Sequence, residues 1–212
     1  MGPDWHQAAL KDKRHKAYED FIAVSEDLIK AGITSVDHLA IRGGSNGGLL
    51  VGNMMTMRPD LFGAVVCAVP LLDMKRYSHL LAGASWMAEY GDPDSDDWSY
   101  LCHLHYLNFI FNVHIYNSYR DFLQEFSPYH NLEPSSVKYP PLLVTTSTKD
   151  DRVHPYHARA FVKRLQDIGA EANTFYYENI EGGHGGAADN KQQAFMTVLY
   201  FEFLNKIIGK MN

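Results

Sequence analysis

Four short apolar runs alternate along the chain with longer stretches of helical periodicity. The runs are bounded by glycine, proline or polar residues and have the length of buried strands. They cover residues 38–42, 64–69, 141–146 and 173–177. The stretches that favour helices cover residues 15–31, 49–57, 156–168 and 192–208. This alternation predicts an α/β fold with a mainly parallel sheet of about four strands, flanked by helices.

Residues 73–135 do not follow this alternation. Within them, residues 101–122 are rich in aromatic side chains and histidines, with no clean period of 2 or 3.6 residues. We interpret residues 101–122 as an inserted hairpin or helical cap, and an interface with another chain is the alternative.

Composition narrows the function classes. With 212 residues, 46% of them hydrophobic, the chain can bury a core of its own, so we expect one domain over residues 1–212. A formal charge of −6 offers no basic surface for nucleic acid. No export signal and no apolar run of ~20 residues is visible, so we expect no membrane association. The two cysteines, Cys67 and Cys102, indicate reduced thiols and hence a cytoplasmic protein.

The segment Gly43-Gly44-Ser45-Asn46-Gly47 satisfies the pattern G-x-S-x-G. It lies between a predicted strand and a predicted helix, which is the context that a nucleophile elbow requires. Small residues beside the serine allow a strained turn to pack closely, and the helix start places a positive dipole end near a developing oxyanion. The motif predicts Ser45 as a nucleophile. An ordinary glycine-rich turn or a phosphate loop is the alternative.

A serine hydroxyl needs a base and an orienting carboxylate, in the chain order serine, acid, histidine. Asp150 follows the third predicted strand, and His184 lies in a glycine-flanked loop after the fourth. All three residues fall at carboxyl ends of predicted strands, where open α/β sheets bind ligands. Asp151 is an alternative carboxylate, and capping of a turn is an alternative role for Asp150.

Two further clusters fail as metal sites. Three alternate aspartates that begin at Asp92 imitate a calcium loop, but Asp97 stands where the glycine of that loop belongs. His103, His105 and His114 lack the spacing of zinc ligands. We expect neither a metal nor a cofactor.

Seven short motifs occur in order along most of the chain. They are Gly2-Pro3-Asp4-Trp5-His6, Gly43-Gly44-Ser45-Asn46-Gly47-Gly48-Leu49, Arg58-Pro59-Asp60-Leu61-Phe62, Tyr90-Gly91-Asp92-Pro93, Ser127-Pro128-Tyr129-His130-Asn131, Asp150-Asp151-Arg152-Val153 and Gly183-His184-Gly185. Together they make the sequence resemble the catalytic domain of the prolyl oligopeptidases, which are serine peptidases of the α/β-hydrolase fold that carry a β-propeller.

The resemblance implies roles for the candidate residues. Ser45 is the expected nucleophile, Asp150 rather than Asp151 is the carboxylate, and His184 is the general base. The backbone N–H of Asn46 is an expected oxyanion donor.

The resemblance also implies a proline pocket. Trp86 and Tyr90 correspond to the pair of aromatic residues that contacts the proline ring. Val153 is expected to line the same pocket, and Arg152 to hydrogen-bond the substrate backbone. Two core aromatics on one helix are the alternative for Trp86 and Tyr90, because they are four residues apart.

The sequence departs from the family at its beginning. Met1 occupies the place of a tyrosine that supplies the second oxyanion donor in the family, and loss of one such donor costs ~3 kcal/mol of transition-state stabilisation. The propeller and the early strands of the sheet are also absent, so we expect a catalytic domain truncated at its N-terminus. The strand before Ser45 would then have an open edge. We therefore expect a homo-oligomer formed through this edge or through residues 101–122, or a poorly soluble fragment.

Three functions remain as hypotheses. By the resemblance, the first is cleavage of proline-containing peptides after proline through an acyl-enzyme on Ser45. The second is hydrolysis of small esters. The third is a catalytically silent module that associates through its exposed sheet edge.

Overall fold

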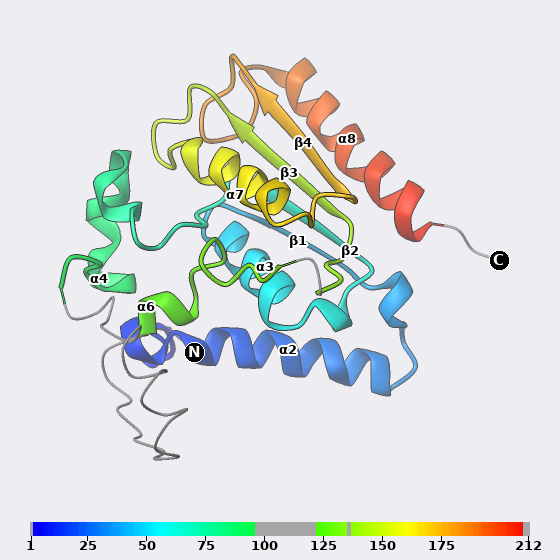
Figure 1. The fold of residues 1–212 in the computed structure, drawn as a ribbon, viewed down its shortest axis with the longest axis horizontal. Helices are drawn as coiled ribbons and strands as arrows, with labels where there is room; N and C mark the ends of the chain where they lie inside the picture. The colour runs from blue at the N-terminus through cyan, green and yellow to red at the C-terminus, as the bar shows by residue number, and fades with distance from the viewer. Residues whose placement is uncertain (1, 96–121, 135–136, 210–212) are drawn as a thin grey trace.

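A four-stranded parallel sheet forms the centre of the protein (Figure 1). The computed structural model describes residues 2–95, 122–134 and 137–209. The strands lie side by side in chain order: β1 (Ala40–Gly44), β2 (Ala64–Ala68), β3 (Leu142–Ser147) and β4 (Thr174–Asn179). The predicted α/β fold with a parallel sheet of four strands is therefore confirmed. The interpretation of residues 101–122 concerns residues outside the described ranges, except for Phe122 at the start of α6 (Phe122–Glu125).

Both faces of the sheet carry apolar side chains. Successive side chains of a strand point to opposite faces, so one apolar strand contributes to both. Val65 and Cys67 of β2 belong to one hydrophobic cluster, whereas Ala64 and Val66 belong to the other. Every residue of β2 is buried, so its sequence reads as a continuous apolar run without alternation.

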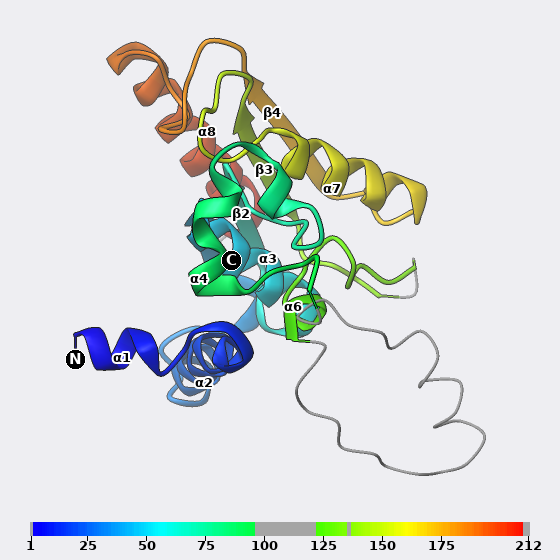
Figure 2. The same ribbon diagram turned by 90° about the vertical axis from the view of Figure 1, so that its left-hand side faces the viewer.

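Helices cover the two faces unequally (Figures 1 and 2). Helices α3 (Asn46–Met57) and α7 (Tyr156–Asp167) contribute to the larger cluster, and α2 (His15–Lys30) packs against α3. Helix α8 (Asn190–Ile208) covers the other face. Within the described ranges, every helix is too short or too polar to cross a bilayer.

Short helical turns occupy the connections between the main elements, and two predicted element boundaries were wrong. They are α1 (Pro3–Gln7), η1 (Lys11–Lys13), η2 (Val36–His38), η3 (Pro59–Leu61), η4 (Tyr77–His79), η5 (Leu81–Trp86) and α4 (Met87–Tyr90). The first strand begins at Ala40, because His38 belongs to η2. Helix α3 begins at Asn46, three residues before the predicted start, because the glycines after Ser45 lie within its first turn.

Candidate active site

Ser45 occupies a sharp turn between β1 and α3. Its backbone φ of 57° and ψ of −119° lie in a region that non-glycine residues rarely adopt. Two hydrogen bonds hold the turn: the Ser45 N–H donates to the Ala68 carbonyl at 3.0 Å, and the Leu49 N–H donates to the Ser45 carbonyl at 3.1 Å. The side chain therefore projects from a fixed position at the carboxyl edge of the sheet.

Close packing explains two of the glycines around this turn. A Cβ atom on Gly43 would lie 1.9 Å from the carbonyl oxygen of Gly47, and one on Gly48 would lie 2.7 Å from the Cβ atom of Pro70. A Cβ atom on Gly47 would meet no other atom within 4 Å. The steric requirement thus falls on Gly43 and Gly48, rather than on the residues directly beside Ser45.

The structure brings Ser45, His184 and Asp150 into one chain of hydrogen bonds. His184 Nε2 lies 3.0 Å from Ser45 Oγ, and His184 Nδ1 lies 2.8 Å from Asp150 Oδ2. Because an ionised carboxylate only accepts hydrogen bonds, Nδ1 carries the proton of neutral His184 and Nε2 is free to accept from the serine hydroxyl. Asp151 is exposed, so Asp150 is the carboxylate that contacts His184.

Hydrogen bonds keep Asp150 ionised in spite of its burial. The side chain is buried, which opposes ionisation. The hydrogen bond from His184 and the backbone N–H groups of Arg152 and Val153, each 2.9 Å from Asp150 Oδ1, outweigh this penalty. The pKa of Asp150 therefore lies below its usual value, and the group is an acceptor at neutral pH.

The loop that carries His184 is held at both ends by Asn179, the last residue of β4. The Asn179 Oδ1 atom accepts from the N–H groups of Glu181 and Gly182, at 2.9 and 3.1 Å. Its Nδ2 atom donates to the Gly186 carbonyl at 3.1 Å and to Gln192 Oε1 at 2.8 Å. Asn179 is buried, so water does not compete for these bonds. No motif or periodicity in the sequence pointed to Asn179.

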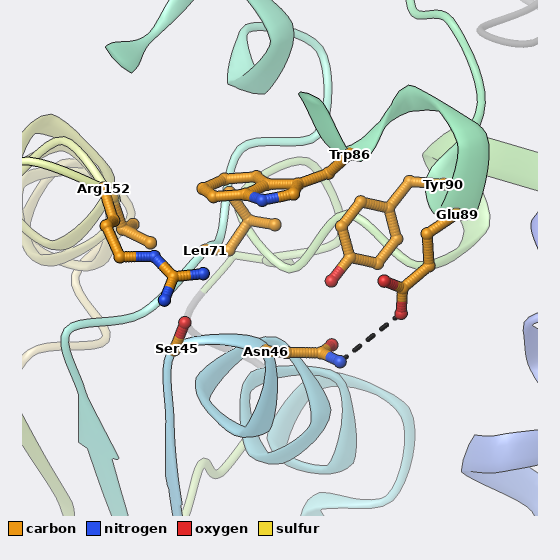
Figure 3. A pocket seen from close by; sticks show the side chains of 8 residues that line it. Ser45, Asn46, Leu71, Trp86, Glu89, Tyr90 and Arg152 are labelled. Carbon is orange, nitrogen blue, oxygen red and sulfur yellow. Dashed lines mark hydrogen bonds between the residues drawn. The ribbon is translucent and has the colours of Figure 1, made fainter. Parts of the chain in front are cut away.

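A pocket of about 260 Å³ opens beside Ser45 (Figure 3). It is smaller than the ~300–1,000 Å³ that is typical of sites for drug-sized ligands, so its size suits a single side chain. All four residues of the predicted proline pocket line it, together with Leu71 and Glu89, which the sequence analysis missed. The lining residues are Ser45, Asn46, Leu71, Trp86, Glu89, Tyr90, Arg152 and Val153.

Two positional signals could have identified the missed residues. Leu71 follows the carboxyl end of β2, the edge where the other candidates were sought. Glu89 lies between the two aromatic residues of the predicted pocket, within α4.

The two aromatic residues of the pocket have different surroundings. Trp86 ends η5 and is half-buried, whereas Tyr90 ends α4 and is 3% exposed. The Tyr90 ring meets Tyr77 edge-on, with ring centroids 5.7 Å apart. Tyr90 therefore belongs to the hydrophobic core and also lines the pocket. The two predictions for this residue, a pocket aromatic and a core aromatic, are thus compatible.

The N-terminus of α3 faces the pocket through Asn46, its first residue. The first backbone N–H groups of a helix have no acceptor within the helix, and they carry the positive end of its dipole. Met1, where the sequence predicted a missing oxyanion donor, lies outside the described residues. Among the residues that the structure describes, no group of three or more metal-ligating side chains is assembled.

A parallel sheet with a serine elbow after one strand, a histidine in contact with that serine and an aspartate in contact with that histidine defines the class of serine hydrolases with an α/β-hydrolase fold. Comparison with known proteins specifies the family. Residues 1–211 match the sequence profile of the prolyl oligopeptidase family, and the chain belongs to this family.

Three relatives illustrate the match. An uncharacterized peptidase of Sinorhizobium fredii is 45% identical over 204 residues, covering 96% of this chain and 25% of that protein. The prolyl endopeptidase of Dictyostelium discoideum is 34% identical over 215 residues, covering 100% of this chain and 26% of that protein. The solved structure of a post-proline cleaving enzyme from Rickettsia typhi has a TM-score of 0.81 and 41% identity, covering 98% of this chain and 27% of that one. The chain thus spans about a quarter of the length of these relatives.

Proposed function

We propose that this chain carries the catalytic site of a serine peptidase that cleaves peptide bonds after proline through an acyl-enzyme on Ser45. The observation that carries the proposal is the hydrogen-bonded series of Ser45, His184 and Asp150. Membership of the prolyl oligopeptidase family supports peptidase chemistry. The names of the relatives from Dictyostelium discoideum and Rickettsia typhi support proline-containing peptides as substrates.

Acylation follows from the hydrogen-bond directions. Ser45 Oγ attacks the carbonyl carbon of the substrate while His184 Nε2 takes the hydroxyl proton. His184 then gives this proton to the leaving amine nitrogen, and the C–N bond breaks to leave an ester on Ser45. Asp150 keeps its negative charge and stabilises the imidazolium that forms between these steps.

Deacylation uses the same groups with water as the nucleophile. His184 Nε2 takes a proton from water, whose oxygen attacks the ester carbonyl, and then returns the proton to Ser45 Oγ as the acyl group leaves. We assign the backbone N–H of Asn46 as a donor to the oxyanion in both steps. Loss of such a donor typically costs ~3 kcal/mol of transition-state stabilisation.

The pocket beside Ser45 would hold the proline ring. Trp86 offers an aromatic face for the flat ring, and Val153 supplies an apolar wall. The guanidinium of Arg152 is directed toward Ser45 (Figure 3), where it can donate to a substrate carbonyl.

Self-association and cellular location are further proposals. Within the described residues β1 pairs with β2 alone, so its other edge presents unpaired backbone groups. This supports a homo-oligomer formed through the β1 edge, while the alternative interface at residues 101–122 concerns residues outside the described ranges. The free, buried thiol of Cys67 supports a cytoplasmic location.

A matched pair of substrates tests the proposed reaction. We expect hydrolysis of a benzyloxycarbonyl-Gly-Pro anilide and of the corresponding ester, and much slower hydrolysis of their Gly-Ala counterparts. Ser45→Ala should reduce both activities to the background rate, whereas Ser35→Ala, at an exposed serine, should not. Cleavage of the ester alone would identify a small-ester hydrolase, and a folded protein without either activity would be a silent module.

A further inference from the structure

Arg14 joins two elements that border the pocket. It lies between η1 and α2, 75 positions before Glu89. Its Nη1 atom donates to Glu89 Oε1 at 2.6 Å, and its Nη2 atom donates to Asn46 Oδ1 at 2.7 Å. The Asn46 side chain completes the triangle by donating to Glu89 Oε1 at 3.4 Å (Figure 3). One guanidinium thus binds both the start of α3 and the helix α4.

The ion pair between Arg14 and Glu89 is sheltered from solvent. The Arg14 side chain is 11% exposed and the Glu89 side chain 27%. The guanidinium also lies over the ring of Tyr90, 5.1 Å from its centroid. Because salt and water screen a partly buried pair less than an exposed one, the positive charge of Arg14 offsets the charge of the Glu89 carboxylate more than a surface ion pair would.

Glu89 contributes a carboxylate to a pocket that otherwise suits an apolar group. The wall includes Leu71, Trp86 and Val153, and its other ionic side chain is Arg152 on the opposite side (Figure 3). An unpaired carboxylate in this wall would attract a cationic side chain. It would also disfavour an apolar ring, because the ring would remove water from the charge without replacing its hydrogen bonds.

We propose that Arg14 is a specificity-determining residue of this pocket, because it neutralises Glu89 and so allows the pocket to accept an uncharged side chain in place of a cationic one. The proposal rests on the proposed function in one respect, namely that the pocket receives the residue before the scissile bond. Arginine suits this task because its planar fork donates to two acceptors at once. The bond from Arg14 Nη2 also holds the side chain of Asn46, whose backbone N–H we assign to the oxyanion.

Binding of two peptides to the Ser45→Ala protein tests the proposal without turnover. The peptides are acetyl-Ala-Gly-Pro-amide and acetyl-Ala-Gly-Lys-amide, and their dissociation constants are measured by calorimetry or NMR titration. We expect the proline peptide to bind at least about tenfold more tightly than the lysine peptide, in the range of coupling between close charges. Arg14→Met should reduce this ratio by about tenfold, which corresponds to ~1.4 kcal/mol.

Two further variants separate the charge effect from a loss of folding. Glu89→Gln leaves Arg14 without its counter-charge, so it should raise the preference for proline over lysine. The double variant Arg14→Met/Glu89→Gln should restore the parent ratio. If circular dichroism shows that Arg14→Met does not fold, the ratio of dissociation constants in Glu89→Gln alone tests the proposal.

The outcomes distinguish this inference from the proposed function. Ratios that change by less than about twofold in the folded single variants would overturn it, as would a Ser45→Ala protein that binds neither peptide. If both peptides bind with the expected ratios but the parent protein hydrolyses no substrate, the proposed function fails and the role of Arg14 stands.

Discussion

At the scale of single residues, the chemistry depends on which nitrogen of His184 carries a proton. Asp150 accepts from Nδ1 at 2.8 Å, so Nε2 faces Ser45 as an acceptor. The backbone N–H groups of Arg152 and Val153 also hold the carboxylate in place, by donating to its Oδ1 atom. Removing the charge without changing the shape of this side chain is therefore an informative substitution.

Asp150→Asn should preserve the fold and abolish most of the activity. The asparagine amide would donate to Nδ1, which places the histidine proton on Nε2 and removes the acceptor for the serine hydroxyl. We expect kcat to fall on the order of 10⁴-fold. The matched control is Asp151→Asn, at the exposed neighbour, which should change kcat less than about threefold; comparable losses in the two variants would contradict the assignment of Asp150.

At the scale of elements, the connection between β4 and α8 positions the proposed base. Asn179 binds both ends of the His184 loop, and Gln192 in α8 binds Asn179 in turn. The loop contains four glycines, so its own backbone has little conformational preference. Its conformation therefore depends on these side-chain bonds.

Asn179→Ala should separate loop order from overall folding. We expect kcat to fall about 10- to 100-fold, because a small misplacement of His184 weakens proton transfer, while far-UV circular dichroism stays unchanged. Asn131→Ala is the control, since the Asn131 amide also bonds backbone groups, but its acceptors are the carbonyls of Gln124 and Glu125 in α6 and not groups of the His184 loop. Equal activity of the two variants would rule out a positioning role for Asn179.

Helix α7 is tied to the segment after β2 by a buried histidine that titrates. His157 Nδ1 accepts from the backbone N–H groups of Leu72 and Asp73, at 3.4 and 3.1 Å. Burial lowers the pKa of His157 to about 4, although the carboxylate of Asp73 acts in the opposite direction. The His157 side chain is buried, so water does not supply these bonds in its place.

His157 should make the free energy of unfolding depend on pH. Between pH 6.5 and about 4 the unfolded chain takes up a proton at this histidine and the folded protein does not, so stability falls as the pH falls, by about 3 kcal/mol over the window. His157→Asn keeps an acceptor and removes the titration, so urea denaturation at several pH values should show a shallower slope. His6→Asn, at an exposed histidine, is the control; an unchanged slope in His157→Asn would refute the assignment.

At the scale of the whole molecule, the sequence predicted the features that depend on residues close together in the chain. The strands, the helices and the turn at Ser45 follow from apolar periodicity and glycine spacing, and the shared carboxyl edge of parallel strands placed Asp150 and His184 near that serine. Arg14 could not be found in this way, because its contacts with Asn46 and Glu89 join segments 32 and 75 positions apart. Such contacts depend on how α2, α3 and α4 pack, which no local pattern specifies.

Within the part of the chain that the structure describes, β1 has one unpaired edge, and this edge leads to a prediction about assembly. We expect the sedimentation coefficient to rise with protein concentration, and hydrogen exchange at the β1 amides to slow over the same range, because pairing with a second chain protects them. Amides of the central strand β3 serve as the internal control. A monomer at every concentration would contradict self-association through this edge.

Covalent labelling of Ser45 tests the central claim most directly. The chain is incubated with a fluorophosphonate, and the modified peptide is located by mass spectrometry, in parallel with Ser45→Ala and Asp150→Asn. The account predicts one adduct on Ser45, no adduct in Ser45→Ala, and labelling slowed by orders of magnitude in Asp150→Asn. A folded protein that remains unlabelled, or one labelled at another residue, would contradict it.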